Sequence, residues 1–238
     1  MRLLPRFVIA LAVAFAASIV MSAQTTPQQS QEVSKAVAGG GITAPGWTGK
    51  IDNTNENAGL TLNDAKFSLE KGVFHVHTGP ATTWWNPANK ASGNYTVKAT
   101  FNEPEYMGIN THPHPYGIVI AGNDMGTDQM SLLYCEAYGN GTFIVRGFGP
   151  AAFSLSPRSA TPNDAVHKAA GKGQPVTQEI AMTVTADKIS CAINGTTVAS
   201  YDKSAAVAPG KLKSTDGVYG IRFAHNTDAT VTGLALVK

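Results

Sequence analysis

Charged side chains are scarce in this chain, since only 14% of its 238 residues are Asp, Glu, Lys or Arg. It contains no cluster of Lys and Arg and so lacks the electrostatic footprint of a protein that binds nucleic acid or an anionic membrane. Walker, dinucleotide-binding, Cys-x-x-Cys-His and Gly-x-Ser-x-Gly signatures are also missing. We therefore expect no nucleic-acid partner and no cofactor, with a divalent metal ion left open.

Long apolar runs are absent apart from one at the N-terminus, Phe7–Val20. Arg2 and Arg6 precede it and the small residues Ser22 and Ala23 follow it, which is the pattern of a secretory signal sequence over residues 1–23. The run is shorter than the roughly 20 residues of a spanning helix, which disfavours the alternative of an uncleaved membrane anchor. The sequence thus predicts an exported protein, periplasmic or extracellular, whose mature chain has no transmembrane segment.

Removal of residues 1–23 lowers the formal net charge of the chain from +2 to zero. Arg2 and Arg6 belong to the 18 basic residues, so 16 remain against 16 acidic ones in residues 24–238. The remaining 215 residues are enough for a substantial core, and β-sandwiches of this size often form one domain.

Cysteine is limited to Cys135 and Cys191, both in strand-like segments. Disulfides persist outside the cytoplasm, so we expect the two residues to be bonded inside the sandwich. The alternative is two small buried thiols that do not meet.

No convincing amphipathic helix interrupts the chain, and its apolar residues recur with a period of two. Tyr95, Val97, Ala99 and Phe101 alternate with polar residues, as in a half-buried strand. Similar segments predict ten to twelve short strands in one domain over residues 46–238, after a polar, Gly-rich flexible leader at residues 24–45.

Turn residues connect these strands as hairpins. Asn194-Gly195, Gly139-Asn140-Gly141 and Lys71-Gly72 each separate two strand-like segments, which indicates antiparallel sheets. Residues 149–175 carry four prolines and three glycines and are long for a plain connection. Two alternatives stay open for this loop: it covers a binding face, or it is a surface insertion with one helical turn near residues 164–170.

Several segments together resemble a known superfamily. They are Ile180–Val184, Lys188–Ile193 ending in Asn194-Gly195, the Gly-rich Gly217–Phe223, a last strand at residues 229–237, and, upstream, Tyr116–Gly122 and Leu133–Arg146. This order resembles the concanavalin A-like lectin/glucanase superfamily, especially laminin-G-like jelly rolls and bacterial secreted 3-keto-disaccharide hydrolase (DUF1080) domains. The resemblance covers residues 46–238 and implies an all-β, two-sheet antiparallel jelly-roll sandwich that binds glycans on a concave face. The Glu-x-Asp-x-Glu motif of laminarinase-like members is absent.

Histidines occur in two His-x-His pairs, His75/His77 and His112/His114. Residues two apart on a strand share a face, and imidazole suits Zn²⁺ and Cu²⁺. All four histidines are therefore candidate metal ligands if the fold brings the pairs together, and unligated polar histidines are the alternative.

Aromatic residues near polar ones are candidates for stacking on sugar rings. The candidate ligand-binding residues are His75, His77, Trp84, Trp85, Tyr116, Tyr134, Tyr138 and Arg146. The competing interpretation places Trp47 and one of Trp84 and Trp85 in the core.

A glycosidase needs two carboxylates in its active site, so the Asp and Glu residues indicate whether the chain could be such an enzyme. Glu136, between Tyr134 and Tyr138, is the candidate catalytic residue, whereas Glu103 and Glu105 fit surface or turn positions equally well. Oxygen-bearing residues in Gly122–Asp128 suit either Ca²⁺ or a plain turn.

The sequence therefore favours a secreted protein that binds a carbohydrate or glycoconjugate over one that acts on it. The alternatives are a hydrolase of glycosides or sugar derivatives, using Glu136 with His75 or His77, and a structural or assembly protein of the envelope or matrix.

Overall fold

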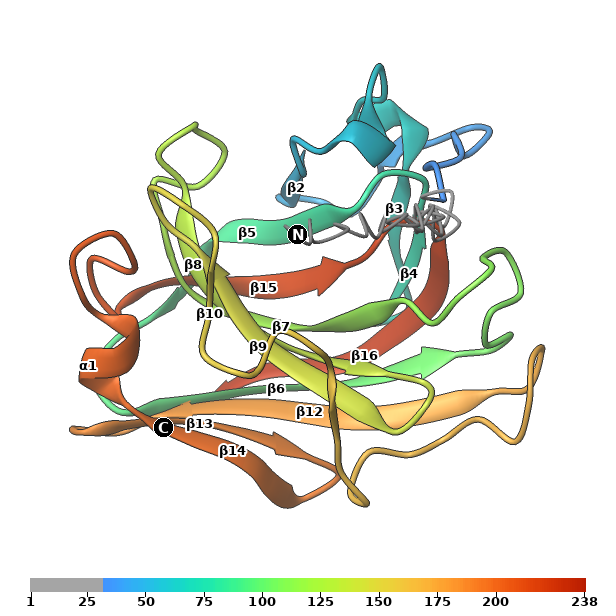
Figure 1. Ribbon diagram of the computed structural model, residues 1–238. Coiled ribbons are helices and arrows are strands. Elements are labelled where there is room, and N and C mark those ends of the chain that lie inside the picture. The colour runs from blue at the N-terminus through green and yellow to red at the C-terminus, as the bar shows by residue number, and fades with distance from the viewer. Residues whose placement is uncertain (1–31) are drawn as a thin grey trace, which may run out of the picture. The chain divides into compact units, whose positions relative to one another are not determined.

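Alternating apolar residues build two β-sheets that pack face to face (Figure 1). The computed structural model describes residues 32–238, so the predicted signal sequence, residues 1–23, lies outside the described residues. Every strand pairing is antiparallel except that of β1 with β3. The two-sheet antiparallel sandwich predicted from the sequence is confirmed.

Sheet A contains eight strands. In spatial order they are β1 (Gly41–Ile42), β3 (Lys66–Glu70), β4 (Val73–Thr78), β16 (Thr227–Val237), β6 (Tyr95–Glu103), β12 (Val176–Val184), β13 (Lys188–Ile193) and β14 (Thr196–Asp202).

Sheet B also contains eight strands. In spatial order they are β10 (Phe153–Ser154), β9 (Thr142–Phe148), β8 (Ser131–Tyr138), β7 (Pro115–Asn123), β15 (Gly217–Phe223), β5 (Thr82–Ala91) and β2 (Thr48–Ile51), with β11 (Thr161–Pro162) also paired with β9. The helices of the described chain are short: α1 (Lys203–Ala206) and two 3₁₀ turns, η1 (Asn55–Asn57) and η2 (Leu62–Asp64).

The core lies between the sheets and follows the predicted alternation. Tyr95, Val97, Ala99 and Phe101 of β6 all point inward and are buried. Cys135 of β8 and Cys191 of β13 form a disulfide, with their Cα atoms 6.2 Å apart. The predicted bond is therefore confirmed, and it connects sheet B with sheet A across the core.

Tight turns have the backbone geometry that their residues indicate. Asn194 and Gly195 both have positive φ, 50° and 80°, as a two-residue hairpin between β13 and β14 requires. Lys71 and Gly72, with φ of 51° and 82°, repeat this geometry between β3 and β4. These hairpins fix the pairing register of the strands that they join.

The first described residues belong to the compact unit Glu32–Lys238. The amide of Val37 donates to the carbonyl of Asp64, β1 pairs with β3, and Ala44 is buried. Residues 32–45, assigned from composition to the flexible leader, are therefore held by tertiary contacts.

The long loop at residues 149–175 extends the edge of sheet B. β10 and β11 both pair with β9, and the Ser156 hydroxyl accepts a hydrogen bond from the amide of Val145. Residues 164–170 form turns and a bridge instead of the predicted helical turn. Within residues 32–238, no helix is both long and apolar enough to span a membrane.

Candidate functional site

Polar side chains gather on the outer face of sheet B, which is turned away from sheet A. Leu133 and Cys135 of β8 belong to the core between the sheets, so Tyr134, Glu136 and Tyr138 point outward. Arg146 of β9 lies opposite Tyr134 in the strand register. Arg222 of β15 also points outward, because its neighbours Ile221 and Phe223 are in the core. We call these five outward-facing residues the sheet B cluster.

A glycine brings two members of this cluster into contact. Gly117 of β7 lies between Glu136 and Arg222 in the strand register. Because Gly117 has no side chain, Arg222 Nε approaches Glu136 Oε1 to 3.4 Å across the central strand. A Cβ atom at position 117 would lie 1.9 Å from the Cys135 carbonyl oxygen, so this position requires glycine.

Arg222 is buried, and its charged guanidinium group is held in place by an ion pair and by aromatic rings. Its guanidinium makes a two-pronged ion pair with Asp52, in which Nη1 donates to Oδ1 over 2.8 Å and Nη2 donates to Oδ2. The same group lies 4.9 Å from the ring centres of both Tyr134 and Phe148. Burial opposes the charge of Arg222, but Asp52 outweighs it and raises the pKa of the guanidinium above its usual value.

Glu136 is a buried carboxyl group with an altered affinity for protons. Only 3% of the residue is exposed, and burial raises its pKa to about 7, although Arg222 acts in the opposite direction. Its contact with Arg222 Nε does not have hydrogen-bond geometry, and Oε1 has no hydrogen-bond partner within the described protein. Glu136 can therefore accept or donate a proton near neutral pH.

A cavity of about 160 Å³ opens beside these groups. It is lined by all five residues of the sheet B cluster and by Asp52 and His225, among others. The Nε atoms of Arg146 and Arg222, like Glu136 Oε1, are buried without a hydrogen-bond partner in the described chain. Three buried polar atoms of cavity-lining residues thus lack a hydrogen bond within the described chain, and two of them, Glu136 Oε1 and Arg222 Nε, face each other at 3.4 Å.

Two of the predicted ligand-binding aromatic residues are in the core, so that prediction is wrong for them. Tyr116 is fully buried and stacks on Phe101, with ring centres 5.6 Å apart. Trp84 is also fully buried and stacks on Phe67 at 4.7 Å. Both follow from strand alternation, which turns Tyr116 of β7 and Trp84 of β5 toward sheet A.

Trp85, the next residue on β5, lines a different hollow. This hollow measures about 650 Å³ and is also lined by Met125, Lys90 and Asp216. Only 4% of Trp85 is exposed, partly because Gly126 in the loop between β7 and β8 lies over its ring. Trp85 is therefore not a lining residue of the cavity beside Glu136.

The two His-x-His pairs do not form one metal site, so the four-histidine arrangement is wrong. His75 and His77 lie on β4 of sheet A, in a shallow hollow with Lys66, Glu70 and Asp228. His112 and His114 precede β7 of sheet B. The order of strands within the sheets, which the sequence spacing does not reveal, separates the pairs.

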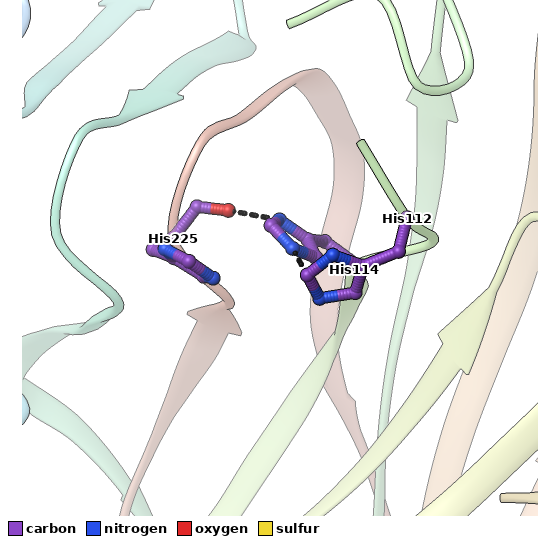
Figure 2. A group of neighbouring side chains, drawn as sticks. All are labelled: His112, His114 and His225. Carbon is purple, nitrogen blue, oxygen red and sulfur yellow. Dashed lines mark hydrogen bonds between the residues drawn. The ribbon is translucent and has the colours of Figure 1, made fainter. Parts of the chain in front are cut away.

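A third histidine joins His112 and His114 instead. His225 lies in the turn between β15 and β16, and one potential ligand atom from each of the three residues lies within 4.8 Å of the others. Figure 2 shows His114 between His112 and His225, in contact with both. The Nε2 atoms of His112 and His114 are 3.1 Å apart, and the rings of His114 and His225 stack at 4.3 Å.

Glu32 places a carboxylate beside two of the three histidines, with Oε2 also 3.9 Å from His114 Nε2. Its Oε2 accepts hydrogen bonds from the Thr111 amide and hydroxyl and lies 3.3 Å from His112 Nδ1. Burial raises the pKa of Glu32, but the hydrogen bonds from Thr111 and the charges of His114 and Lys35 outweigh it and bring the pKa to about 2. Burial lowers the pKa of His114 to about 4.

The other oxygen-rich candidates lie elsewhere. Glu103 ends β6 in sheet A and points into the interior, whereas Glu105 is exposed in the following loop. In the loop at residues 122–128, Asp124 pairs with Lys213, and Asp128 lies 3.3 Å from Lys50. These carboxylates pair with lysines, so the turn interpretation accounts for the loop.

Comparison with known proteins identifies the fold. No family model matches the sequence, and no curated protein matches it. A galectin-like protein of unknown function from Bacillus subtilis has a TM-score of 0.51 and 14% identity, over 80% of this chain and 88% of that protein. The fold is a galectin-like jelly roll. This agrees with the concanavalin A-like fold predicted from the sequence.

Two further structures have lower scores. A proposed glycosyl hydrolase from Parabacteroides distasonis gives a TM-score of 0.48 at 13% identity, over 81% of this chain and 98% of that protein. The carbohydrate-binding module CBM66 from Bacillus subtilis gives 0.45 at 11% identity, over 84% of this chain and 99% of that module. Function is therefore argued from the residues of the site.

Sequence reasoning missed four residues around the site: Glu32, Asp52, Arg222 and His225. Arg222 carries a signal, because a single arginine interrupts the apolar Gly217–Phe223 segment. No sequence pattern marks Glu32, Asp52 or His225 as site residues, because each reaches its partners from a loop or a terminal segment far away in the sequence.

Proposed function

We propose that this protein is an exported carbohydrate-binding protein whose ligand occupies the cavity lined by the sheet B cluster. The observation that carries the proposal is the set of buried atoms without hydrogen-bond partners in the described protein, namely Glu136 Oε1, Arg146 Nε and Arg222 Nε. Buried polar groups rarely lack partners, and those that do call for a specific explanation. Sugar hydroxyls can donate to the carboxylate and accept from the guanidinium groups.

The shape and lining of the cavity support a small ligand. Tyr134 and Tyr138 contribute flat ring surfaces beside the charged groups, which is the combination that a sugar ring with apolar C–H faces requires. The cavity, at about 160 Å³, is smaller than the roughly 300–1,000 Å³ of pockets that enclose drug-sized molecules. We therefore expect one sugar unit, free or at the end of a glycan, to enter it.

Export is part of this proposal. The Cys135–Cys191 disulfide supports it, because disulfides are rare in the cytoplasm and persist outside it. The resemblance of the sequence to DUF1080-type secreted domains agrees with the same location.

Binding is tested by titrating the purified protein with a panel of monosaccharides and oligosaccharides in a calorimeter. We expect Glu136→Gln to weaken binding at least tenfold, because a hydrogen bond to a charged group contributes about 1.5–3 kcal/mol. Tyr138→Ala should also weaken binding, through the lost ring contact.

Matched variants serve as controls. Glu105→Gln changes an exposed glutamate of the loop after β6, and Tyr201→Ala changes a half-buried tyrosine on β14 of sheet A. Both should retain wild-type affinity. Equal affinity in Glu136→Gln and wild type would contradict the assigned site.

Glycoside hydrolysis is the second candidate, favoured by two observations. A pKa of about 7 suits Glu136 as a general acid, and Asp52 places a second carboxylate at the same cavity. Release of reducing sugar from an oligosaccharide by the wild type, abolished in Glu136→Gln, would identify a hydrolase. Intact oligosaccharide after incubation with a protein that binds it would identify a binding protein.

A further inference from the structure

The three histidines are brought together by two connections that are far apart in the sequence. His112 and His114 lie in the segment between β6 and β7, and His225 lies in the turn between β15 and β16. Among the side chains of residues 32–238, this is the group of His, Cys, Asp and Glu whose potential ligand atoms converge closely enough to hold a metal ion. His112 is half exposed, so the group is accessible from solvent.

Hydrogen bonding determines which ring nitrogens face each other. His114 Nδ1 contacts the main-chain carbonyl of His225, and a carbonyl only accepts, so Nδ1 carries the hydrogen (Figure 2). His112 Nδ1 lies 3.3 Å from the carboxylate of Glu32 and 3.4 Å from Thr111 Oγ1, whose own hydrogen is donated to Glu32, so this nitrogen carries a hydrogen as well. The Nε2 atoms of these two rings, 3.1 Å apart, are thus left as the metal-binding atoms.

The separation of these atoms fits two ligands of one ion. Zn²⁺–N bonds of 2.0–2.1 Å in a tetrahedral site place ligand nitrogens about 3.3–3.4 Å apart. The observed 3.1 Å is close to this value. A proton shared between these two Nε2 atoms would require one of the rings to be doubly protonated and charged. A divalent cation bound by both atoms requires no such charge on a ring.

Partners behind the rings complete the arrangement. Histidines that bind metals usually donate their second ring hydrogen to a carboxylate or carbonyl, which fixes the ring and strengthens its basicity. Glu32 has this position behind His112, and the His225 carbonyl has it behind His114. His225 Nδ1 lies 3.2 Å from Ser34 Oγ, whose hydrogen is donated to Asn57 Oδ1.

We propose that His112, His114 and His225 bind one divalent transition-metal ion of the zinc and copper type, with Glu32 orienting His112. Three imidazoles favour these ions over Mg²⁺ and Ca²⁺, which prefer oxygen ligands. Because His225 also lines the cavity beside Glu136, the ion would lie at the edge of the proposed carbohydrate site.

The test is a zinc titration of the purified full chain, prepared without a histidine tag and stripped with a chelator. We expect one Zn²⁺ per chain in the calorimeter, and Co²⁺ substitution should give the visible absorption of a site with nitrogen ligands. His114→Ala should abolish this binding. Glu32→Gln should weaken it by roughly 10–100-fold, as for other partners that orient metal-binding histidines.

Two control variants separate loss of the metal site from loss of the fold and from binding at the other histidine pair. His112→Ala alters a half-exposed side chain and should also lose the ion while the protein stays folded by circular dichroism. The double variant His75→Ala/His77→Ala, on sheet A, should bind Zn²⁺ like the wild type. No binding by the wild type, or loss of binding in the His75/His77 variant alone, would overturn the proposal. This readout is independent of sugar binding, so the two proposals can fail separately.

Discussion

At the scale of single residues, the molecule keeps several ionisable groups out of water. Glu136 and Arg222 face the cavity on the outer face of sheet B, whereas Glu103 points into the interior between the sheets. The Met107 amide donates to Glu103 Oε1 over 3.2 Å, and Oε2 has no partner in the described protein. Burial, opposed by this hydrogen bond and assisted by Asp228, raises the pKa of Glu103 from 4.5 to about 7.

This shift predicts that stability falls as the pH rises. The folded state holds the Glu103 proton more tightly than the unfolded state, so the stabilisation is complete below pH 4.5 and is lost as the pH rises through about 7. The loss amounts to about 3 kcal/mol, because one pKa unit corresponds to about 1.4 kcal/mol. Tyr106 and Tyr116, which interact with Glu103, have raised pKa values and stay neutral in this range.

Urea unfolding between pH 4.5 and 8 measures the effect. The wild type should lose about 3 kcal/mol of its free energy of unfolding through Glu103 between pH 4.5 and 8. Glu103→Gln keeps a neutral side chain of the same shape and should not show this loss. Glu136 contributes with the same sign and remains in both proteins. Exposed Glu105→Gln should follow the wild-type curve, and identical curves for Glu103→Gln and wild type would contradict the prediction.

At the scale of elements, the hairpins fix strand register. The Asn194-Gly195 turn sets β13 against β14, and the Asn194 side chain also bonds to β12 by accepting from the Glu179 amide. Register matters here because a shift by one residue would turn Ile189, Cys191 and Ile193 away from the core. The turn therefore also positions Cys191 for its disulfide.

Replacing the turn glycine should cost stability through backbone strain alone. Gly195 has φ of 80° with nothing near its missing Cβ, so Gly195→Ala introduces no clash but forces alanine into the left-handed region. We expect a loss of about 1 kcal/mol in the free energy of unfolding. Gly171→Ala is the matched control, since Gly171 also has open space but not this backbone conformation, and it should be neutral or slightly stabilising. Equal effects of the two substitutions would exclude strain as the cause.

At the scale of the whole molecule, the two sheets are joined by the disulfide as well as by the core. Cys135 and Cys191 are 56 residues apart, and a cross-link of that loop length restricts the unfolded chain by about 4 kcal/mol. The double variant Cys135→Ala/Cys191→Ala should lose stability of this order in urea or thermal unfolding. Wild-type protein under reducing conditions should approach the same value, and an unchanged midpoint in both would contradict a structural role for the bond.

Much of the architecture could be predicted from the sequence because it depends on local patterns. Alternation placed Tyr95, Val97, Ala99 and Phe101 inside, and Asn-Gly and Lys-Gly pairs marked the hairpins. The structure has sixteen strands in residues 32–238 against ten to twelve predicted, mainly because β1, β10 and β11 are only two residues long and are formed by tertiary pairing.

The candidate sites were only partly predictable. Glu136, Tyr134, Tyr138 and Arg146 come from two adjacent strands joined by one hairpin, so local reasoning could group them. Alternation could not say which face of β7 or β5 was the core, so Tyr116 was placed on the wrong side. For Trp84 the competing interpretation, which put one of Trp84 and Trp85 in the core, is the correct one. The histidine pairs share a motif, but His75 and His77 lie on β4 of sheet A, whereas His112 and His114 lie in the connection before β7 of sheet B, and no local pattern reveals this separation.

The sequence by itself determined most of the strands, the hairpin turns and the all-β class, because each depends on a short pattern, and it left each cysteine one possible partner. Only the tertiary structure decided that Asp52 and Arg222 flank Glu136, and that Glu32 and His225 join His112 and His114. The physical reason is that strand order in a sandwich is set by packing of the whole core. Residues 170 or 191 positions apart therefore become neighbours without any local signal.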